Sequence, residues 1–370
     1  MEKMDEARKP RVVRRLRIGR RSLPVTTAFD SYWRFASERQ SLFFRRVAGE
    51  DPPWTTDPIL AAHRFTNVYR ASDRVSQYLI RNVIYVGEQT AEEVFFRTVL
   101  FKLFNRIGTW ERLQEGVGEI SWRRYSFKQY SCELDALFDA GGRVYSAAYI
   151  MPTPRFGERR KHANHLRLIE HMMLDCAPQK IADATSLRAV FELLRSYPSL
   201  GDFLAFQLAI DLNYGPLIAF SEMEFVVAGP GARDGIRKCF LDADGLGEET
   251  IIRFVAEIAD TEFSRLGLDF PSLWGRPLQL IDCQNVFCEL GKYARVAHPD
   301  IEGISGRTRI KQKYTPVSRQ VPQWYPPKWG INAAVVESAR SDLASERTPG
   351  KGLPAQQSFA DQLFRPTLAG

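Results

Sequence analysis

The stretch that decides the fold reads Tyr197-Pro-Ser-Leu-Gly-Asp-Phe-Leu-Ala-Phe-Gln-Leu-Ala-Ile-Asp-Leu212. Pro198 cannot continue a helix, and it presets the backbone for a tight turn. Gly201 supplies the backbone freedom that such a turn needs, including a positive φ. One helix face after the turn carries leucine at a spacing of four: Leu204, Leu208 and Leu212. The pattern predicts two helices joined by a short turn, a helix-hairpin-helix.

Such a turn exposes backbone N–H groups at the start of its second helix. Free donors and the helix dipole both favour an anion there, and in nucleic-acid enzymes the anion is a backbone phosphate. The N–H groups around Gly201 are therefore candidate DNA contacts. The alternative is an ordinary turn between two helices of an all-α core.

Composition describes a soluble chain with a large core. The 370 residues are 44% hydrophobic and 26% charged, and no apolar run is long enough to span a bilayer. The N-terminus lacks the apolar segment of a secretory signal. Five scattered cysteines, an odd number, favour reduced thiols and a cytoplasmic location. Without a Cys-x-x-Cys or a His-Glu-x-x-His we predict no metal site and no cofactor.

The positive charge is concentrated at the N-terminus. Residues 1–25 contain nine Lys or Arg and three Asp or Glu, so they hold +6 of the net charge of +7. The basic side chains include Arg11, Arg14, Arg15, Arg17, Arg20 and Arg21. We predict a disordered basic arm over residues 1–25 that binds nucleic acid. The alternative is a tail that only increases solubility.

The remaining chain reads as helices, with no convincing strand pattern. We predict an all-α, two-lobed domain over residues 26–315, with lobes at about 26–185 and 186–300. Residues 316–370 are predicted to be a Pro-rich segment and a loose tail. One long helix is expected from Ile59 to about Val86. Thr90 and Glu93 form a capping-box pattern before an apolar helix.

Three further patterns bear on chemistry. Arg159 and Arg160 lie in a basic run that could face phosphates. Gly229-Pro-Gly231, followed by Arg233, could form a backbone nest for an anion, although it could equally be a plain turn. On the expected helix 278–293 the spacing places four polar residues on one stripe: Asp282, Asn285, Glu289 and Lys292.

The hairpin resembles base-excision DNA glycosylases of the helix-hairpin-helix superfamily. Pro198, Leu200, Gly201 and Ala205 match the turn, and the run from Gly215 to Phe220 matches the approach to the catalytic Asp. That position falls here on Ser221-Glu222, and Glu224 lies two residues further. The lysine of bifunctional glycosylases would fall near Phe203, so the resemblance implies no lyase chemistry. The catalytic Asp of these glycosylases is also replaced in this chain, so the resemblance does not by itself imply plain base excision.

A second resemblance covers most of residues 26–315. The chain is similar to the helical domain of 5-hydroxymethyldeoxyuridine DNA kinases, which is grouped with the alpha-glutamyl/putrescinyl thymine pyrophosphorylases of phage DNA hypermodification. Five stretches carry the similarity: Pro53–Leu60, Phe65–Arg74, Leu100–Arg106, Gly229–Ala232 and Asp282–Tyr293. The resemblance implies an all-α, glycosylase-like module that handles a modified thymine in DNA. The chain contains no Gly-x-x-x-x-Gly-Lys-Ser/Thr, so we do not expect kinase activity.

The resemblance leads to three functional hypotheses. The first is a DNA-base hypermodification protein that acts on, or presents, a flipped 5-substituted pyrimidine such as 5-hydroxymethyluracil. The second is a monofunctional DNA glycosylase, and the third is a non-catalytic DNA-binding module. DNA is the expected partner, other base-modification enzymes could join it, and no membrane is expected.

Site residues follow from these hypotheses. The resemblance places three carboxylates for acid–base work: Glu222, Glu224 and Asp211. Asp282, Asn285 and Lys292 are expected on an opposite wall. The expected contacts to DNA phosphates are Gly201, Gly229, Gly231, Arg233, Arg70, Arg74, Arg159 and Arg160.

Overall fold

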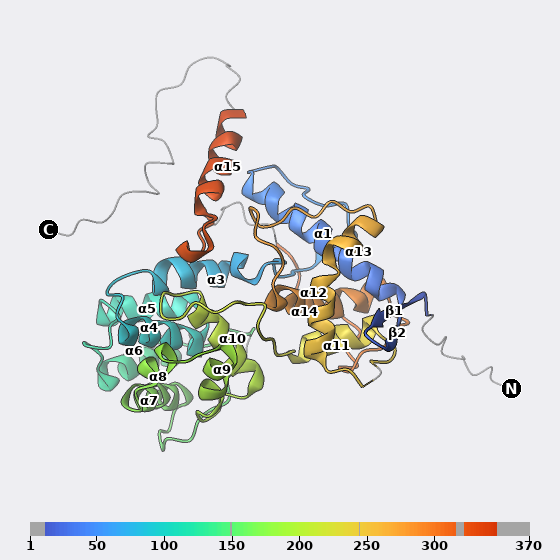
Figure 1. Cartoon of the computed structure of the whole chain (residues 1–370). Coiled ribbons are helices and arrows are strands. Elements are labelled where there is room, and N and C mark those ends of the chain that lie inside the picture. The colour runs from blue at the N-terminus through green and yellow to red at the C-terminus, as the bar shows by residue number, and fades with distance from the viewer. Residues whose placement is uncertain (1–11, 149, 244, 316–321, 346–370) are drawn as a thin grey trace, which may run out of the picture.

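The computed structural model describes residues 12–148, 150–243, 245–315 and 322–345. Within these residues the chain forms α-helices α1 to α15, three short 3-10 or π-helical turns and one two-stranded sheet. The all-α prediction is therefore confirmed. Figure 1 shows two helical lobes side by side, with α15 rising from the top of the molecule. None of the helices in the described part is long and apolar enough to cross a membrane.

The first lobe surrounds α4, whose side chains from Val94 to Phe104 are buried on almost every face. This agrees with a sequence that is apolar all round, which is typical of a central helix. Thr90 caps α4 as predicted, but the Glu93 carboxylate binds backbone N–H groups of Trp122 and Arg123 instead of completing the capping box. The lobe comprises α3 (Arg74–Leu79), α4 (Ala91–Phe104), α5 (Ile107–Val117), α6 (Phe127–Asp139), α7 (Lys161–Leu174), α8 (Ala177–Ala182), α9 (Leu187–Arg195) and α10 (Asp202–Asn213).

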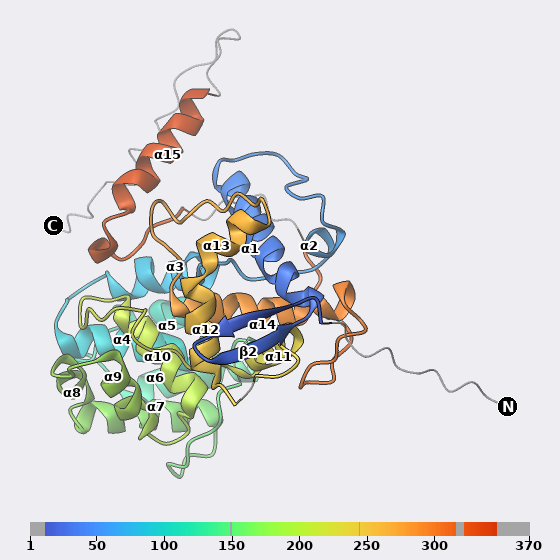
Figure 2. The same cartoon turned by 45° about the vertical axis from the view of Figure 1, so that its right-hand side comes forward.

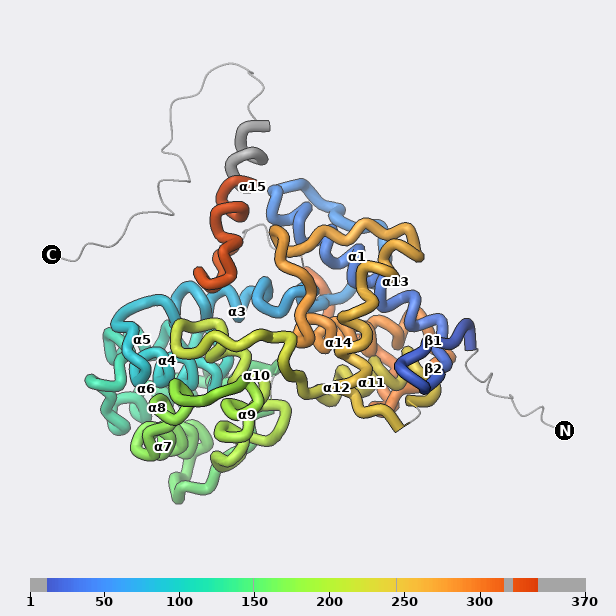
Figure 3. The backbone as a smooth tube through the Cα atoms, viewed as in Figure 1, coloured from blue at the N-terminus to red at the C-terminus, as the bar shows by residue number. Residues whose placement is uncertain are grey.

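The second lobe joins the two ends of the domain around α14, as the tube in Figure 3 shows. Helix α14 packs against α1 and α2 from the N-terminal end and against α11 and α12 from the C-terminal end. The predicted lobe boundary near residue 185 therefore falls inside the first lobe, between α8 and α9. The elements of the second lobe are α1 (Thr27–Val47), α2 (Pro58–Ala62), α11 (Pro230–Cys239), α12 (Glu248–Glu257), α13 (Ala259–Arg265) and α14 (Leu280–Ala297).

Glycine allows α11 and α14 to cross in direct backbone contact. A Cβ atom on Gly235 would lie 1.9 Å from the carbonyl oxygen of Phe287, and one on Gly231 would lie 2.3 Å from the Cys288 sulfur. Gly291 faces them from α14. The requirement for glycine at 231 and 235 thus has a packing explanation.

The N-terminal arm is not disordered over its described part. Strands β1 (Arg14–Ile18) and β2 (Arg21–Val25) form an antiparallel hairpin, which Figure 2 shows against the second lobe. Leu23 and Val25 are fully buried, and Val25 forms a β-bridge with Phe240. These apolar contacts supply the free energy that orders the hairpin. Arg11 lies outside the described residues.

The predicted helix from residue 59 to 86 is interrupted. It is replaced by α2, an irregular segment, the 3-10 turn η1 (Arg70–Ser72), α3 and the π-helical turn η2 (Ile80–Ile84). The C-terminal prediction also needs correction, because residues 322–345 are ordered. Residues 322–331, which we call the strap, include the 3-10 turn η3 (Pro327–Trp329) and lead into α15 (Asn332–Ser345).

Candidate functional site

The predicted hairpin corresponds to α9, a short turn and α10. Its positive φ lies at Ser199 (67°), whereas Gly201 has φ −74° and ψ 174°, an extended conformation open to any residue. Gly201 is the N-cap of α10 and has no side chain to satisfy the first N–H groups. Asp202 is exposed and pairs with Arg195 at 2.7 Å. The expectation of a strained glycine at 201 is therefore wrong, while phosphate binding stays a prediction.

The start of α11 lies beside the start of α10. A Cβ atom on Gly229, the N-cap of α11, would lie 2.6 Å from the Phe203 ring of α10. Two helix N-termini without side-chain caps are thus brought together by Phe203. Arg233, in the first turns of α11, is half exposed, and its guanidinium is 3.5 Å from the Glu248 carboxylate. This places the predicted phosphate contacts at 201, 229 and 233 on neighbouring helix ends.

Asp211 is fully buried on α10 and belongs to a charge network with Arg70 and Lys102. Its carboxylate is 2.9 Å from the Arg70 guanidinium and 3.1 Å from the Lys102 ammonium. Arg70 also donates to Gln207 at 2.9 Å and to the Tyr214 hydroxyl at 3.1 Å. Arg70, predicted as a phosphate contact, is therefore enclosed by protein. Asp211, predicted as an acid–base group, is buried and paired with two cations, which is typical of a structural role.

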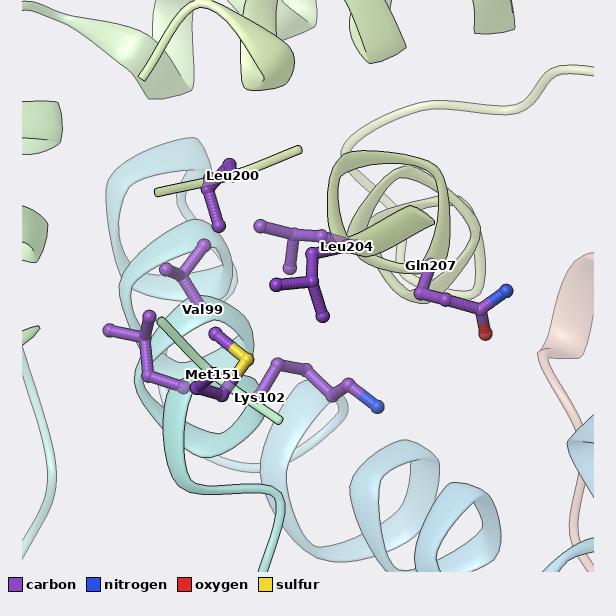
Figure 4. Close-up of a pocket in the computed structure, with 8 residues that line it drawn as sticks. Val99, Lys102, Met151, Leu200, Leu204 and Gln207 are labelled. Atoms are coloured by element: carbon purple, nitrogen blue, oxygen red, sulfur yellow. The ribbon is translucent and has the colours of Figure 1, made fainter. Parts of the chain in front are cut away.

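A small apolar hollow lies beside this network, between α4 and α10. Figure 4 shows Lys102 and Gln207 pointing to one side of it, away from Leu200. Its enclosed part holds little more than a water molecule, so it does not admit a pyrimidine ring in this conformation. The lining residues are Val99, Lys102, Leu103, Met151, Leu200, Leu204, Gln207 and Leu208.

The polar stripe of α14 exists as predicted, and its partners are backbone groups of residues 64–70. Asp282 accepts from the Arg70 N–H (2.9 Å), and Asn285 donates to the Asn67 carbonyl (2.7 Å). Glu289 accepts from the Thr66 N–H, and Lys292 donates to the Arg64 carbonyl. The stripe fixes the irregular segment that breaks the expected helix. Asn285 and Lys292 are therefore engaged in this fixation, not in lining an open wall.

Glu222 lies at the junction of the lobes. Its side chain is buried, and one carboxylate oxygen accepts from the Arg276 guanidinium at 3.0 Å. Burial raises the pKa of Glu222 most, Arg276 lowers it, Asp282 raises it, and Arg70 and Lys328 lower it, so that together they bring it to about 7. Burial likewise raises the pKa of Asp282 to about 6, against the N–H groups of Arg70 and Gln279. A carboxyl group with a pKa near 7 can take up or release a proton at neutral pH.

The groups around Glu222 form what we call the central cluster: Arg70, Asp211, Tyr214, Glu222, Arg276 and Asp282. Arg276, Tyr214 and the strap residues near them were not singled out from the sequence. For the strap, the signal was an aromatic-rich stretch, Trp324 to Trp329, inside the predicted Pro-rich segment.

Glu224 does not join the central cluster. It is exposed, and its carboxylate accepts from the backbone N–H groups of Leu187 and Arg188 at 3.2 and 3.4 Å. Glu224 therefore caps α9 across the hairpin. The Glu224 carboxylate is thus engaged in capping α9 and does not lie beside Glu222, where acid–base work was predicted.

The remaining predicted arginines differ in accessibility. Arg74, the first residue of α3, and Arg159 are both exposed. Arg160 is held between Asp135 and Asp139 at 3.1 and 2.9 Å, so its charge is already paired. Among the described residues no group of His, Cys, Asp and Glu could hold a metal ion.

Comparison with known proteins adds the family. The family described as 5-hmdU DNA kinase, helical domain, matches residues 26–303. The chain belongs to this family. The 5-hmdU DNA kinase of Bacillus phage SP10 is 29% identical over 289 residues, covering 72% of this chain and 45% of the relative. The chain thus spans less than half the length of that protein. No solved structure matches the present chain.

Proposed function

We propose that this chain is a DNA-base hypermodification protein that receives a flipped 5-substituted pyrimidine, of the 5-hydroxymethyluracil type, at the central cluster. Family membership supports the substrate class. The observation that carries the site is Glu222, a buried carboxyl group with a pKa near 7 at the junction of the lobes. Extrahelical bases are read by hydrogen bonds and by stacking on aromatic or guanidinium planes, and Tyr214 and Arg276 supply these groups beside Glu222.

The proposed role of Glu222 is proton transfer to or from the base substituent or its attacking group. Arg276 keeps the carboxylate oriented, and Asp282 raises its proton affinity. The charge network at Asp211 and the stripe on α14 position these groups without contacting DNA. DNA phosphates would be held outside the cluster, at the neighbouring N-termini of α10 and α11.

The test measures binding and product separately. Duplexes with a single thymine or a single 5-hydroxymethyluracil are compared for affinity, and nucleosides from DNA incubated with the protein and host extract are analysed by mass spectrometry. We expect tighter binding of the modified duplex and a new or consumed base, lost in Glu222→Gln. Equal affinity for both duplexes contradicts the proposal. Discrimination without any change of base favours presentation of the base to another enzyme.

The second candidate is a monofunctional DNA glycosylase, favoured by Glu222 at the position that the resemblance assigns to the catalytic acid. It predicts alkali-labile abasic sites in modified duplex, abolished by Glu222→Gln and kept by Glu224→Gln, because Glu224 caps α9. Intact DNA after prolonged incubation contradicts this candidate while leaving the first in place.

A further inference from the structure

The strap crosses the junction of the lobes and is anchored on both. In the first lobe, the Trp324 N–H donates to Gln77 at 2.8 Å, and the Lys328 ammonium donates to the carbonyls of Gly215 and Ile218 at 2.9 and 2.6 Å. In the second lobe, the Arg276 guanidinium lies 3.7 Å from the centre of the Trp329 ring. The strap lies outside the residues matched by the family, 26–303.

Trp329 places a planar ring directly against the central cluster. Its indole meets the Tyr214 ring edge-on at 5.6 Å and stacks on Tyr325 at 5.9 Å with 20° between the planes. The third contact of the indole is the Arg276 guanidinium, and this same guanidinium binds the Glu222 carboxylate. The indole thus occupies the place between the Arg276 guanidinium and the Tyr214 ring, and Arg276 in turn binds the Glu222 carboxylate.

These are the groups that recognise an unstacked base. Guanidinium and aromatic planes stack on any base, whereas a carboxyl group and a hydroxyl select the hydrogen-bonding edge. The indole fulfils the stacking part of this recognition and leaves no room for a second ring on the same face of Arg276. The Trp329 side chain therefore stands where the base would stack.

The geometry points to the slot between Arg276 and Tyr214 as a pyrimidine-binding site that the strap closes with Trp329. We propose that the strap swings out when a flipped base enters, so that base and indole compete for one place. This inference rests on the proposed function for the identity of the base. The competition itself concerns any DNA base that reaches the slot.

Anchoring of the strap is strong enough to keep the slot closed, yet local. Tyr325 is fully buried, its hydroxyl is 2.8 Å from the Ser72 hydroxyl, and its backbone makes two hydrogen bonds with the Asn332 side chain. Trp329, by contrast, is only partly buried and is held by ring contacts. Tyr325 thus serves as a pivot, and the turn η3 with Lys328 and Trp329 is the part that moves.

The experiment uses the full chain and compares two ratios of DNA affinity. Affinity is measured for the thymine and the 5-hydroxymethyluracil duplex with the wild type, Trp329→Ala, Trp329→Phe and the matched control Trp54→Ala. Trp54 lies against Arg46 at the end of α1 and does not touch the central cluster. We expect Trp329→Ala to tighten binding about tenfold if the strap is closed roughly 90% of the time, Trp329→Phe to tighten it less, and Trp54→Ala to leave it unchanged.

The two ratios separate the two proposals. The variant-to-wild-type ratio tests the strap, and unchanged or weaker binding by Trp329→Ala overturns the competition. The modified-to-unmodified ratio tests the proposed function. If Trp329→Ala tightens both duplexes equally, the strap proposal stands and the preference for 5-hydroxymethyluracil falls.

Hydrogen exchange provides a readout that does not depend on a variant. Adding the duplex to wild-type protein is expected to speed amide exchange in the segment of Trp329 and Gly330, whose N–H groups bond within η3, while Tyr325 at the pivot keeps its protection. Slower exchange in that segment, with the duplex bound, would show that the strap stays closed over DNA and would overturn the proposal.

Discussion

Three buried carboxyl groups of the central cluster have different surroundings, and these separate their chemistry. Asp211 faces two cations, and Asp282 accepts two backbone N–H groups. For Glu222, burial raises the pKa most, Arg276 lowers it, Asp282 raises it, and Arg70 and Lys328 lower it. With a pKa raised to about 7, the Glu222 carboxyl group can exchange a proton at neutral pH.

The raised pKa of Glu222 makes stability depend on pH. In the native state its pKa is about 7 and the reference value is 4.5, so between these values the native state holds a proton that the unfolded state has released. Stability is therefore lost as pH rises through this window. Between pH 4.5 and 8 the unfolding free energy of the wild type should fall about 3 kcal/mol more than that of Glu222→Gln, as followed by urea denaturation. Parallel pH profiles would contradict the pKa assignment.

Asp211→Asn is expected to be far more damaging than other changes of a carboxylate. It leaves Arg70 and Lys102 buried without their anion, which costs about 3–5 kcal/mol. The matched control is Glu224→Gln, an exposed helix cap, with an expected cost of about 1 kcal/mol. Urea denaturation measures both. Similar losses in the two variants would show that the network is not the stabilising unit that its burial implies.

At the scale of elements, the contact between α11 and α14 is decided by glycine. Gly235→Ala would place a methyl group 1.9 Å from the Phe287 carbonyl, and moving two helix backbones apart should cost about 3 kcal/mol. Gly201→Ala, with no heavy atom within 4 Å of the new group, should cost at most about 1 kcal/mol. Thermal unfolding of the two variants checks the difference, and equal midpoints would exclude a tight helix crossing.

The start of α10 offers a clean test of phosphate binding, since Gly201 is unstrained. If its N–H groups hold a DNA phosphate, Gly201→Val should weaken binding about tenfold at nearly unchanged stability, because the side chain crowds the anion. Gly247→Val is the matched control, as Gly247 is the N-cap of α12 with φ −70° and open space around it. Equal DNA affinity of both variants would make the hairpin core architecture only.

Elements with a strong local pattern could be predicted from the sequence. The apolar α4 and the stripe on α14 follow from spacing within one helix, and the turn between α9 and α10 follows from Pro198 and Gly201. The break before Arg70 could not be predicted, because it depends on hydrogen bonds from α14, more than 200 residues away. Of the site, Glu222 was reached through a resemblance, while Arg276 and Trp329 come from segments joined only in the fold.

On the scale of the whole molecule, the second lobe joins both ends of the domain, and the N-terminal hairpin is its outermost element. Leu16 and Ile18 face inward along β1, while Arg15 and Arg17 alternate with them and are exposed. Arg20, in the turn, is exposed as well. An ordered ribbon therefore presents the basic side chains that the sequence assigned to a disordered arm.

This ribbon gives a prediction for salt dependence. If Arg15, Arg17 and Arg20 each neutralise a phosphate, replacing all three by Gln should weaken binding to modified and unmodified duplex alike. The slope of log K against log salt should become shallower by about 2.7, at roughly 0.9 per contact. The fold should persist, because Leu23 and Val25 hold the hairpin. A matched double change to Gln at Arg123 and Arg124, exposed arginines of the first lobe, should leave the slope near its wild-type value. An unchanged slope in the triple variant would show that the ribbon does not contact DNA, and phosphate binding would then rest on the N-termini of α10 and α11.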